Sequence, residues 1–346
     1  MSQSLAVKYR PVTFEQILGQ SVTTKILKRA VETRNFKHCY LFSGNSGCGK
    51  TTISRCLARE INKGAGMPIE IDAASHGGVE DVRAIMEAGK QRAVDAEYKV
   101  FIIDECHAIT QHGWNAFLLG LEEPSPYTIY IFCTTEPNKI PEAVRNRMQR
   151  YTITKISQGE IKQRLMEICH NEGFTNYEQA CDLISKTTHG CMRDAIMKLE
   201  QCADFDTNLA LENVQQVLSS TSFDALVYLT WALYVRDDSQ QLQAGILWTI
   251  ENLYNNGADL KSFIELYLEF LLDLTKYAVY RDLKLTSIPE YLEPTIINLT
   301  GAIKEPRWYL DLVDQLLKIK LEIRYDAFYK STIEAFLLEF YNRGEA

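Results

Sequence analysis

The sequence predicts an α/β domain with a parallel sheet, followed by two all-helical domains. In the first part of the chain, short apolar runs rich in β-branched and aromatic residues alternate with segments of helical apolar spacing. Several of these runs are apolar throughout, as expected for strands that are buried on both faces. After about residue 157 only helical patterns follow, and the charge balance changes near residue 218.

The strands of the first domain can be placed in order along the chain. They are predicted over residues 39–43, 68–72, 100–103, 128–133 and 150–154. Helical spacing fills the segments between them, as in residues 79–93, and predicts helices on both faces of the sheet.

The rest of the chain is predicted to be helical. Helices over residues 158–172, 176–187, 191–204 and 209–218, joined by short polar turns, suit a small bundle. From residue 221 longer helical patterns dominate, with breaks at Gly257, Pro289 and Pro294. We therefore expect a core over residues 1–156 and helical domains over residues 157–219 and 220–346.

Composition bounds the class of protein. At 346 residues, 46% apolar and 24% charged, the chain is typical of globular proteins. No apolar run is long and uncharged enough to span a bilayer, and the N-terminus lacks the apolar core of a signal peptide. We expect a cytoplasmic protein with no membrane partner, in the host cytoplasm if the source is viral. Nine cysteines without a CxxC pair indicate reduced core thiols.

The net charge of −8 is concentrated in the last third of the chain. Residues 219–346 hold 12 Lys and Arg against 19 Asp and Glu, whereas the rest is nearly balanced. An acidic chain is not expected to coat nucleic acid indiscriminately, although a fold can still form a local basic groove.

A nucleotide-binding motif follows the first predicted strand. Residues 44–51 read GNSGCGKT, which fits the P-loop pattern Gly-x-x-x-x-Gly-Lys-Ser/Thr and opens a helical pattern. In such a loop the backbone amides surround the phosphates, Lys50 reaches the β- and γ-phosphates, and Thr51 supplies a Mg²⁺ ligand. The predicted nucleotide contacts are Gly44, Asn45, Ser46, Gly47, Cys48, Gly49, Lys50, Thr51 and Thr52.

A pair of carboxylates ends the third predicted strand. Asp104 is expected to hold Mg²⁺, directly or through water, and Glu105 to polarise the attacking water. The letters DECH over residues 104–107 also head the motif of a helicase group, but those helicases need two nucleotide-binding domains. This chain turns helical after the first, so His107 is predicted to be a local structural or communication residue.

These motifs, with several shorter segments, resemble AAA+ clamp-loader ATPases, most closely the bacterial DNA polymerase III gamma/tau family. The segments are residues 8–20 (KYRPVTFEQILGQ), 70–75 (EIDAAS), 115–124 (NAFLLGLEEP), 133–137 (CTTEP) and 190–195 (GCMRDA). They occur in the family's order, and the resemblance is specific from residue 5 to about 200. It implies that the core is an AAA+ ATPase domain, residues 157–219 a lid, and residues 220–346 a collar that holds subunits in a ring.

The resemblance also assigns roles to residues. Tyr9, Arg10 and Pro11 belong to the opening segment, which packs against the adenine base. Thr135 falls at the sensor 1 position beside the γ-phosphate, Arg193 at sensor 2, and Arg147 at the arginine finger that acts on a neighbouring subunit. The expected catalytic residues are Lys50, Asp104, Glu105, Thr135, Arg147 and Arg193, with Thr51 and Asp104 as metal ligands and ATP and Mg²⁺ as cofactors.

The sequence departs from the family pattern in three places. Residues 60–68 leave no room for the family's four-cysteine zinc module, so no zinc is expected. The finger motif reads Asn146-Arg147-Met148 instead of Ser-Arg-Cys, and Arg145 and Arg150 remain alternatives. No tail extends beyond the expected collar, so tethering to a polymerase and a helicase is not expected.

Contacts with DNA are implied by the family and only weakly marked in the sequence. In the family, the helix after the 70–75 segment carries basic residues towards the template backbone. Here Gly77 and Gly78 offer backbone amides that can bind phosphate, and Arg83 offers a charge. A flexible turn before a solvated helix is the alternative.

The resemblance implies a clamp-loader subunit. ATP binding would assemble a ring with other clamp-loader subunits, expected to be a pentamer, that holds a sliding clamp open around primer–template DNA. Hydrolysis would then release the loader and leave the clamp closed. Another AAA+ DNA-remodelling motor, for branch migration or replication initiation, would need an appended DNA-binding module. A scaffold subunit with a weak ATPase is disfavoured because Lys50, Thr51, Asp104, Glu105 and Arg193 are all present.

Overall fold

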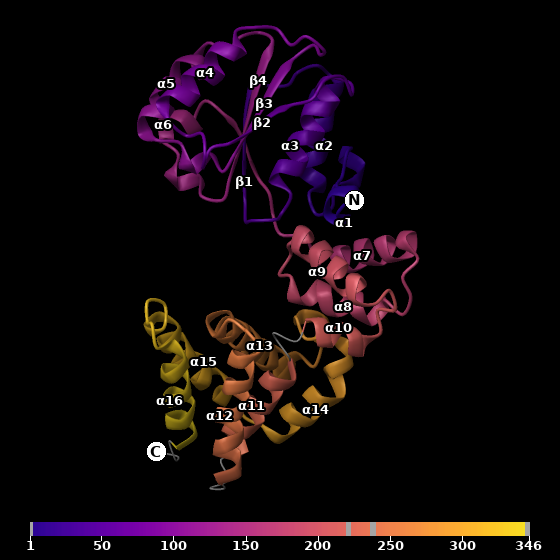
Figure 1. Cartoon of the computed structure of the whole chain (residues 1–346), viewed down its shortest axis with the longest axis vertical. Helices are drawn as coiled ribbons and strands as arrows, with labels where there is room; N and C mark the ends of the chain where they lie inside the picture. Colours follow the sequence, from indigo (N-terminus) through magenta and orange to yellow (C-terminus); the bar gives the residue numbers. More distant parts are fainter. Residues whose placement is uncertain (1–2, 219–222, 236–239, 343–346) are drawn as a thin grey trace. The chain divides into compact units, whose positions relative to one another are not determined.

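A computed structural model describes residues 3–218, 223–235 and 240–342 of the chain (Figure 1). The chain divides into two compact units, Met1–Ile168 with Thr188–Glu200, and Cys169–Thr187 with Gln201–Ala346. The expected boundary between residues 219 and 220 lies outside the described residues, and the division into core, lid and collar stays a prediction.

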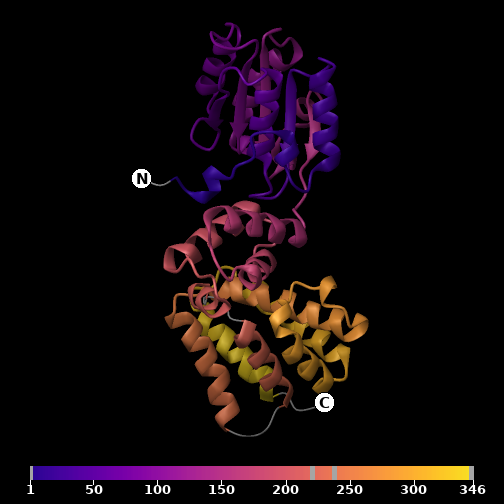
Figure 2. The ribbon, with the colours of Figure 1, turned by 90° about the vertical axis from the view of Figure 1, so that its right-hand side faces the viewer.

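The first unit is built on one parallel sheet. Its strands are β1 (Cys39–Ser43), β2 (Ile69–Asp72), β3 (Lys99–Asp104), β4 (Thr128–Thr134) and β5 (Gln149–Thr152), in the order β2-β3-β4-β1-β5. Helices α4 (Val79–Gly89) and α5 (Gln111–Glu122) lie on one face, and α2 (Ser21–Glu32) and α3 (Lys50–Ile61) on the other (Figures 1 and 2). This confirms the predicted α/β fold, and each predicted strand lies within two residues of the observed one.

Each face of the sheet has its own hydrophobic core, because successive side chains of a strand point to opposite faces. Leu41, Phe101 and Phe132 pack under α4 and α5, whereas the next residues along the same strands, such as Phe42 and Ile102, pack under α3. Burial on both sides explains why these strands are apolar throughout.

Helix α4 ends at Gly89, four residues earlier than its apolar spacing suggests. A Cβ at Gly89 would lie 2.2 Å from the Tyr130 hydroxyl oxygen, so the helix terminus is fitted closely against β4. Thr128 donates a hydrogen bond to the Gly89 carbonyl, and Lys99 donates one to the Ala88 carbonyl. Side chains at the start of β3 and β4 thus donate hydrogen bonds to carbonyls of the last turn of α4, which would otherwise lack partners.

The first unit also contains several short helical segments and most of two longer helices. They are α1 (Leu5–Lys8), η1 (Phe14–Gln16), η2 (Cys106–Ala108), η3 (Pro137–Lys139), α6 (Glu142–Arg145), α7 (Gln158–Glu172) and α9 (Met192–Phe205). The last turns of α7 and α9 belong to the second unit.

Helices are the main elements of the second unit among its described residues, which also form one isolated bridge between Thr175 and Asn208. Its other helices are α8 (Glu178–Thr187), α10 (Leu211–Val217), α11 (Phe223–Val235), α12 (Gln240–Asn255), α13 (Leu260–Tyr280), η5 (Leu283–Leu285), η6 (Glu290–Leu292), α14 (Glu293–Ala302), α15 (Pro306–Glu322) and α16 (Tyr329–Asn342). Helix α13 packs along α15, and α12 along α16. Within the described residues, no helix is both long and apolar enough to cross a membrane.

The expected helix breaks are borne out in part. Gly257 separates α12 from α13, and Pro289 precedes η6. Pro294 does not break a helix but lies in the first turn of α14, where a missing backbone N–H costs nothing.

Candidate nucleotide site

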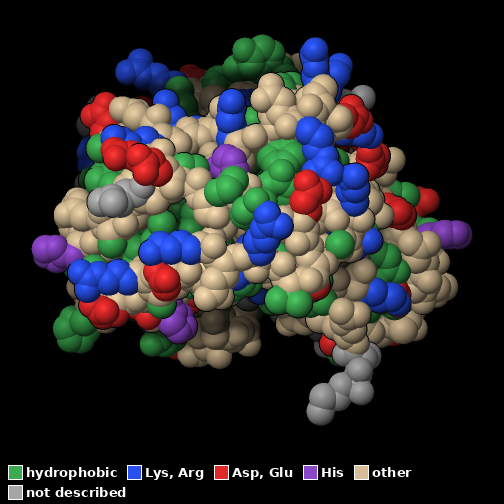
Figure 3. All heavy atoms as spheres, turned by 90° about the horizontal axis from the view of Figure 1, so that it is seen from above, with side chains coloured by type: hydrophobic (Ala, Val, Ile, Leu, Met, Phe, Trp, Pro, Cys, Tyr) green, Lys and Arg blue, Asp and Glu red, His purple; other side chains and the backbone are tan. Residues whose placement is uncertain are grey.

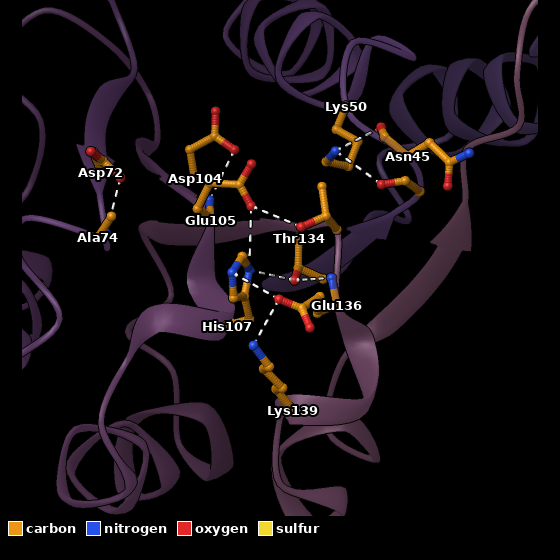
Figure 4. A network of polar contacts seen from close by, with 12 residues as sticks. Asn45, Lys50, Asp72, Ala74, Asp104, Glu105, His107, Thr134, Glu136 and Lys139 are labelled. Carbon is orange, nitrogen blue, oxygen red and sulfur yellow. Dashed lines mark hydrogen bonds and ion pairs between the residues drawn. The ribbon is translucent and has the colours of Figure 1, made fainter. Parts of the chain in front are cut away.

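The carboxyl ends of three neighbouring strands bring the predicted phosphate-side residues together (Figure 4). Strand β1 leads into the P-loop, β4 leads to Thr135, and β3 ends in Asp104, which Glu105 follows. Because β4 lies between β1 and β3, the sensor position is placed between the loop and the carboxylates. In parallel α/β sheets this edge is where ligands bind.

The P-loop curls around its own lysine. Gly49 precedes α3 at φ 102°, a left-handed conformation that glycine adopts without steric cost. Helix α3 begins at Lys50, so the first amides of the helix have no partner within it. The Lys50 ammonium donates hydrogen bonds to the Gly44 and Asn45 carbonyls, each 3.0 Å long. The loop therefore holds a cation and the amide donors of a helix N-terminus at one place, which fits a polyphosphate.

The two predicted metal ligands are in direct contact. The Thr51 hydroxyl donates a 2.7 Å hydrogen bond to Asp104 Oδ2, and the Glu105 amide donates one of 3.0 Å to Asp104 Oδ1. A hydroxyl and a carboxylate are hard oxygen ligands of the kind that Mg²⁺ prefers, usually with water completing the shell. The donor set fits the expected ion.

Glu105 is held in an uncommon backbone conformation. Its φ of 44° and ψ of 41° are left-handed, which costs of order 1–3 kcal/mol for a residue other than glycine. The Thr135 hydroxyl donates a 3.3 Å hydrogen bond to Glu105 Oε2, and His107 Nδ1 lies 3.3 Å from the same oxygen. The structure thus places the expected water-activating carboxylate beside the expected sensor.

An open cavity adjoins the P-loop within the first unit. Side chains of the N-terminal segment, the P-loop and helices α7 and α9 line it: Ala6, Tyr9, Arg10, Pro11, Gln16, Ile17, Leu18, Gly47, Cys48, Gly49, Thr52, Ile156, Arg164, Met192, Arg193 and Ile196. The residues expected around the adenine base and the expected sensor 2 arginine therefore share one cavity with the P-loop.

Two residues that the sequence did not single out hold the N-terminal segment, and one of them, Arg164, also lines this cavity. Arg164 on α7 donates a 3.1 Å hydrogen bond to the Tyr9 carbonyl and places its guanidinium 5.8 Å from the centre of the Tyr9 ring. Glu200 on α9 accepts hydrogen bonds from the Ser4 hydroxyl at 2.8 Å and the Leu5 amide at 2.9 Å. The N-terminal segment is thereby fixed to α7 and α9.

The thiols near the site are buried. All nine cysteines are free thiols, and burial raises the pKa of Cys48 and takes that of Cys133 to about 12. Thiols with raised pKa values are poor metal ligands, because the thiolate is the binding form. The link from α3 to β2 is only residues 62–68. Within the described parts of the chain, no three His, Cys, Asp or Glu side chains are grouped so that they could hold a metal ion, and the expectation of no zinc stays a prediction.

Arg147 lies at the amino ends of the parallel strands, whereas the P-loop lies at their carboxyl ends. It precedes β5, whose first residue, Gln149, pairs with Tyr40 at the start of β1. The P-loop instead follows the last residue of β1, Ser43. Arg147 forms an ion pair with Glu122 and a hydrogen bond to the Ala143 carbonyl. The structure does not bring Arg147 to the nucleotide site of its own chain.

The predicted DNA contacts already have other partners. The Gly78 amide donates a 3.1 Å hydrogen bond to Asp81, and Arg83 forms an exposed ion pair of 2.8 Å with Glu80. A Cβ at Gly77 would lie 2.6 Å from the Ala73 carbonyl oxygen, which explains the glycine by close packing alone. On the face in Figure 3, Lys and Arg are interspersed with Asp and Glu among the described residues. A phosphate at Gly78 would have to displace Asp81, so these contacts stay predictions.

Comparisons with known structures agree with the fold. The Thermotoga maritima RuvB Holliday junction branch migration motor superimposes with a TM-score of 0.53 and 19% identity, covering 71% of this chain and 80% of that one. A point mutant of the same protein gives the same score at 18% identity, with the same coverage of both chains. At this identity the likeness extends to the AAA+ fold alone.

Sequence comparison identifies the family. The profile described as DNA polymerase III, delta subunit, matches residues 68–157. The chain is 32% identical over 292 residues to DNA polymerase III subunit gamma/tau of Mycobacterium tuberculosis strain H37Rv, covering 77% of this chain and 50% of the relative. It is 30% identical to the tau subunit of Bacillus subtilis, covering 93% and 60%. The chain thus spans about half to three fifths of the length of these two relatives.

A shorter relative is covered more fully. The chain is 31% identical to DNA polymerase III subunit gamma of Buchnera aphidicola over 262 residues, which cover 69% of this chain and 72% of the relative. Together with the order of motifs and the AAA+ sheet, this match shows that the chain belongs to the DNA polymerase III gamma/tau family.

Proposed function

We propose that this chain is an ATPase subunit of a clamp loader, which uses ATP and Mg²⁺ to place a sliding clamp on primer–template DNA. The observation that carries the proposal is the meeting of Lys50, Thr51, Asp104 and Glu105 at one edge of the sheet in a chain of the gamma/tau family. The lid over residues 157–219 and the collar over residues 220–346 are part of this proposal.

Each residue type suits its proposed step. Lys50 would exchange its two carbonyl contacts for the β- and γ-phosphates, and Thr51 and Asp104 would hold Mg²⁺, which supplies charge neutralisation at the phosphates. Glu105 would accept the proton of the attacking water, with Thr135 beside it to orient the group. Arg193, at the wall of the cavity, would complete the site from the lid.

The proposed ring needs a surface for neighbouring subunits. Helix α15 exposes Leu310, Leu317 and Leu321, with exposed fractions of 46%, 48% and 73%. Spacings of seven and four residues put these side chains along one stripe of the helix. The stripe supports assembly through the collar, which we propose to be a pentamer with other clamp-loader subunits. The sliding clamp and DNA are proposed as partners from the family relationship alone.

Turnover assays on paired variants test the ATPase. Lys50→Ala should weaken ATP binding because the cation at the phosphates is lost. Glu105→Gln should keep ATP binding but lower kcat by about 10²–10⁴-fold, because an amide cannot take the proton. The measurements are ATP affinity by calorimetry and phosphate release at saturating ATP, and ordinary turnover by Glu105→Gln would disprove the assignment of the base.

A loading assay separates the proposed function from the alternatives. Turnover should rise when a sliding clamp and primed DNA are added together with the partner subunits, and the clamp should become topologically linked to circular DNA. Stimulation by branched DNA without a clamp would favour a different AAA+ motor. Normal clamp loading by Lys50→Ala would favour a scaffold role.

A further inference from the structure

One histidine at the carboxyl end of β3 has no part in the chemistry above, yet it contacts the residues around the proposed base. His107 Nδ1 lies 3.2 Å from Thr134 Oγ1 and 3.3 Å from Glu105 Oε2, and its Nε2 lies 3.4 Å from Glu136 Oε1 (Figure 4). The His107 side chain is only 20% exposed. The ring therefore bridges the end of β3 and the loop after β4 in a largely enclosed place.

The backbone around His107 is fixed. The left-handed turn at Glu105 leads into η2, where the Ala108 amide donates a 2.9 Å hydrogen bond to the Glu105 carbonyl. Cys106, between the two, is fully buried. Because its neighbours on both sides are held, the ring of His107 reaches the Glu105 carboxylate from a defined position.

The far side of the ring is fixed as well. Lys139 donates a 2.8 Å hydrogen bond to Glu136 Oε1, and this bond holds the pKa of Glu136 below its usual value. Glu136 is therefore an acceptor, and its amide donates a 2.9 Å hydrogen bond to Thr134 Oγ1. The loop after β4 thus presents a charged acceptor to Nε2 of His107.

We propose that His107 is a positioning residue for Glu105: with a proton on both ring nitrogens, Nδ1 donates towards the Glu105 carboxylate and restrains it beside Thr135, and Nε2 donates towards Glu136, which orients the ring. This inference rests on the proposed function, in which Glu105 activates water. Without the ring, the Glu105 carboxylate keeps the 3.3 Å hydrogen bond from Thr135 but loses its second restraint. A flexible carboxylate spends less time in the reactive geometry, and a misplacement of about 1 Å can cost about 10²-fold in rate.

Two substitutions separate the two sides of the ring. The amide of asparagine can replace Nδ1 but is too short to reach the position of Nε2, whereas glutamine reaches the position of Nε2 and leaves that of Nδ1 empty. We expect His107→Asn to keep most of the kcat for ATP, and His107→Gln and His107→Ala to lose up to about 10²-fold. ATP affinity should be unchanged in all of them, since the contacts of His107 are with Glu105, Thr134 and Glu136 and not with the P-loop.

Further variants exclude a loss of fold as the cause. Glu136→Gln keeps the size of the side chain and removes its charge, and should lower kcat by a smaller factor in a chain that melts normally. His107→Ala added to Glu105→Gln should lower kcat no further, because the group it positions is already gone. A further loss in that double variant would show that His107 acts elsewhere.

The outcomes distinguish this inference from the proposed function. Equal loss in His107→Asn and His107→Gln, or full kcat in His107→Ala while Glu105→Gln is inactive, overturns the positioning role and leaves the proposed function standing. Ordinary turnover by Glu105→Gln itself would instead overturn the catalytic assignment on which the inference rests.

Discussion

At the scale of single residues, the part of the site expected around the phosphates could be predicted from the sequence. The part expected around the adenine base could be predicted only in part. The P-loop is a local pattern, so the spacing of Gly49, Lys50 and Thr51 predicts their geometry directly. Arg164 and Glu200 are different, because their partners Tyr9 and Leu5 lie 155 and 195 positions away. No periodicity relates residues so far apart, and only the fold brings them together.

Glu200 offers a test of how the N-terminal segment is held. In Glu200→Gln one side-chain oxygen becomes a donor, which faces either the Ser4 hydroxyl or the Leu5 amide and cannot accept from it. Hydrogen bonds to charged groups contribute about 1.5–3 kcal/mol, and part of this should appear as a rise of about threefold to tenfold in the Kd for ATP. The kcat at saturating ATP should not change.

Calorimetry with a non-hydrolysable ATP analogue measures this effect. Glu212→Gln is the matched control, because Glu212 is exposed on α10 and belongs to the second unit, whereas Glu200 belongs to the first unit with the N-terminal segment. An unchanged Kd in Glu200→Gln would mean that the N-terminal segment is held adequately by its other contacts.

At the scale of elements, the apolar pattern predicted the strands and helices well and their ends less well. The strands were placed within two residues because burial on both faces leaves continuous apolar runs. The helix predicted over residues 79–93 extends four residues beyond the observed end at Gly89. That end depends on the fit of Gly89 against Tyr130, which is a contact between two elements. Helical spacing carries no information about such a contact.

The loop between β2 and α4 gives a prediction of this kind. A Cβ in Gly77→Ala would lie 2.6 Å from the Ala73 oxygen and 2.9 Å from the Ala108 oxygen. Both are backbone atoms, so one of the two segments must move, at a cost of about 1–3 kcal/mol. Because Ala108 belongs to the turn that follows Glu105, we also expect a lower kcat.

Chemical denaturation and turnover should be measured together for this variant. Gly159→Ala on α7 is the control, since its added Cβ would meet no described atom within 4 Å, and alanine should stabilise that helix by up to about 1 kcal/mol. If Gly77→Ala were as stable and as active as the parent, the loop would have room that the structure does not indicate.

At the scale of the whole molecule, the compact units depend on contacts that the charge pattern and the apolar pattern do not contain. The last turns of α7 and α9 group with the C-terminal helices, whereas their earlier turns group with the sheet. Apolar spacing predicts that a helix exists, but the body to which each turn belongs depends on contacts over long sequence distances.

We propose that Arg147 acts on the nucleotide of a neighbouring chain in the assembly. It precedes the amino end of β5, while the P-loop follows the carboxyl end of the neighbouring β1, so the two lie at opposite edges of the sheet. An arginine at that edge is badly placed for its own nucleotide and can serve a neighbour's once its ion pair with Glu122 is released. An arginine finger supplied in this way contributes about 10³–10⁵ in rate by neutralising charge in the transition state.

Arg147→Ala should therefore bind ATP nearly normally and hydrolyse it poorly, and mixing variants gives the sharper measurement. Arg147→Ala chains keep an intact P-loop, and Lys50→Ala chains keep an intact finger, so each is inactive alone. In a mixed ring, some interfaces join a good P-loop to a good finger, and phosphate release should partly return. Arg145→Ala and Arg150→Ala are the neighbouring controls. If mixed rings form without activity while one of these controls reproduces the loss, the finger is that arginine and not Arg147.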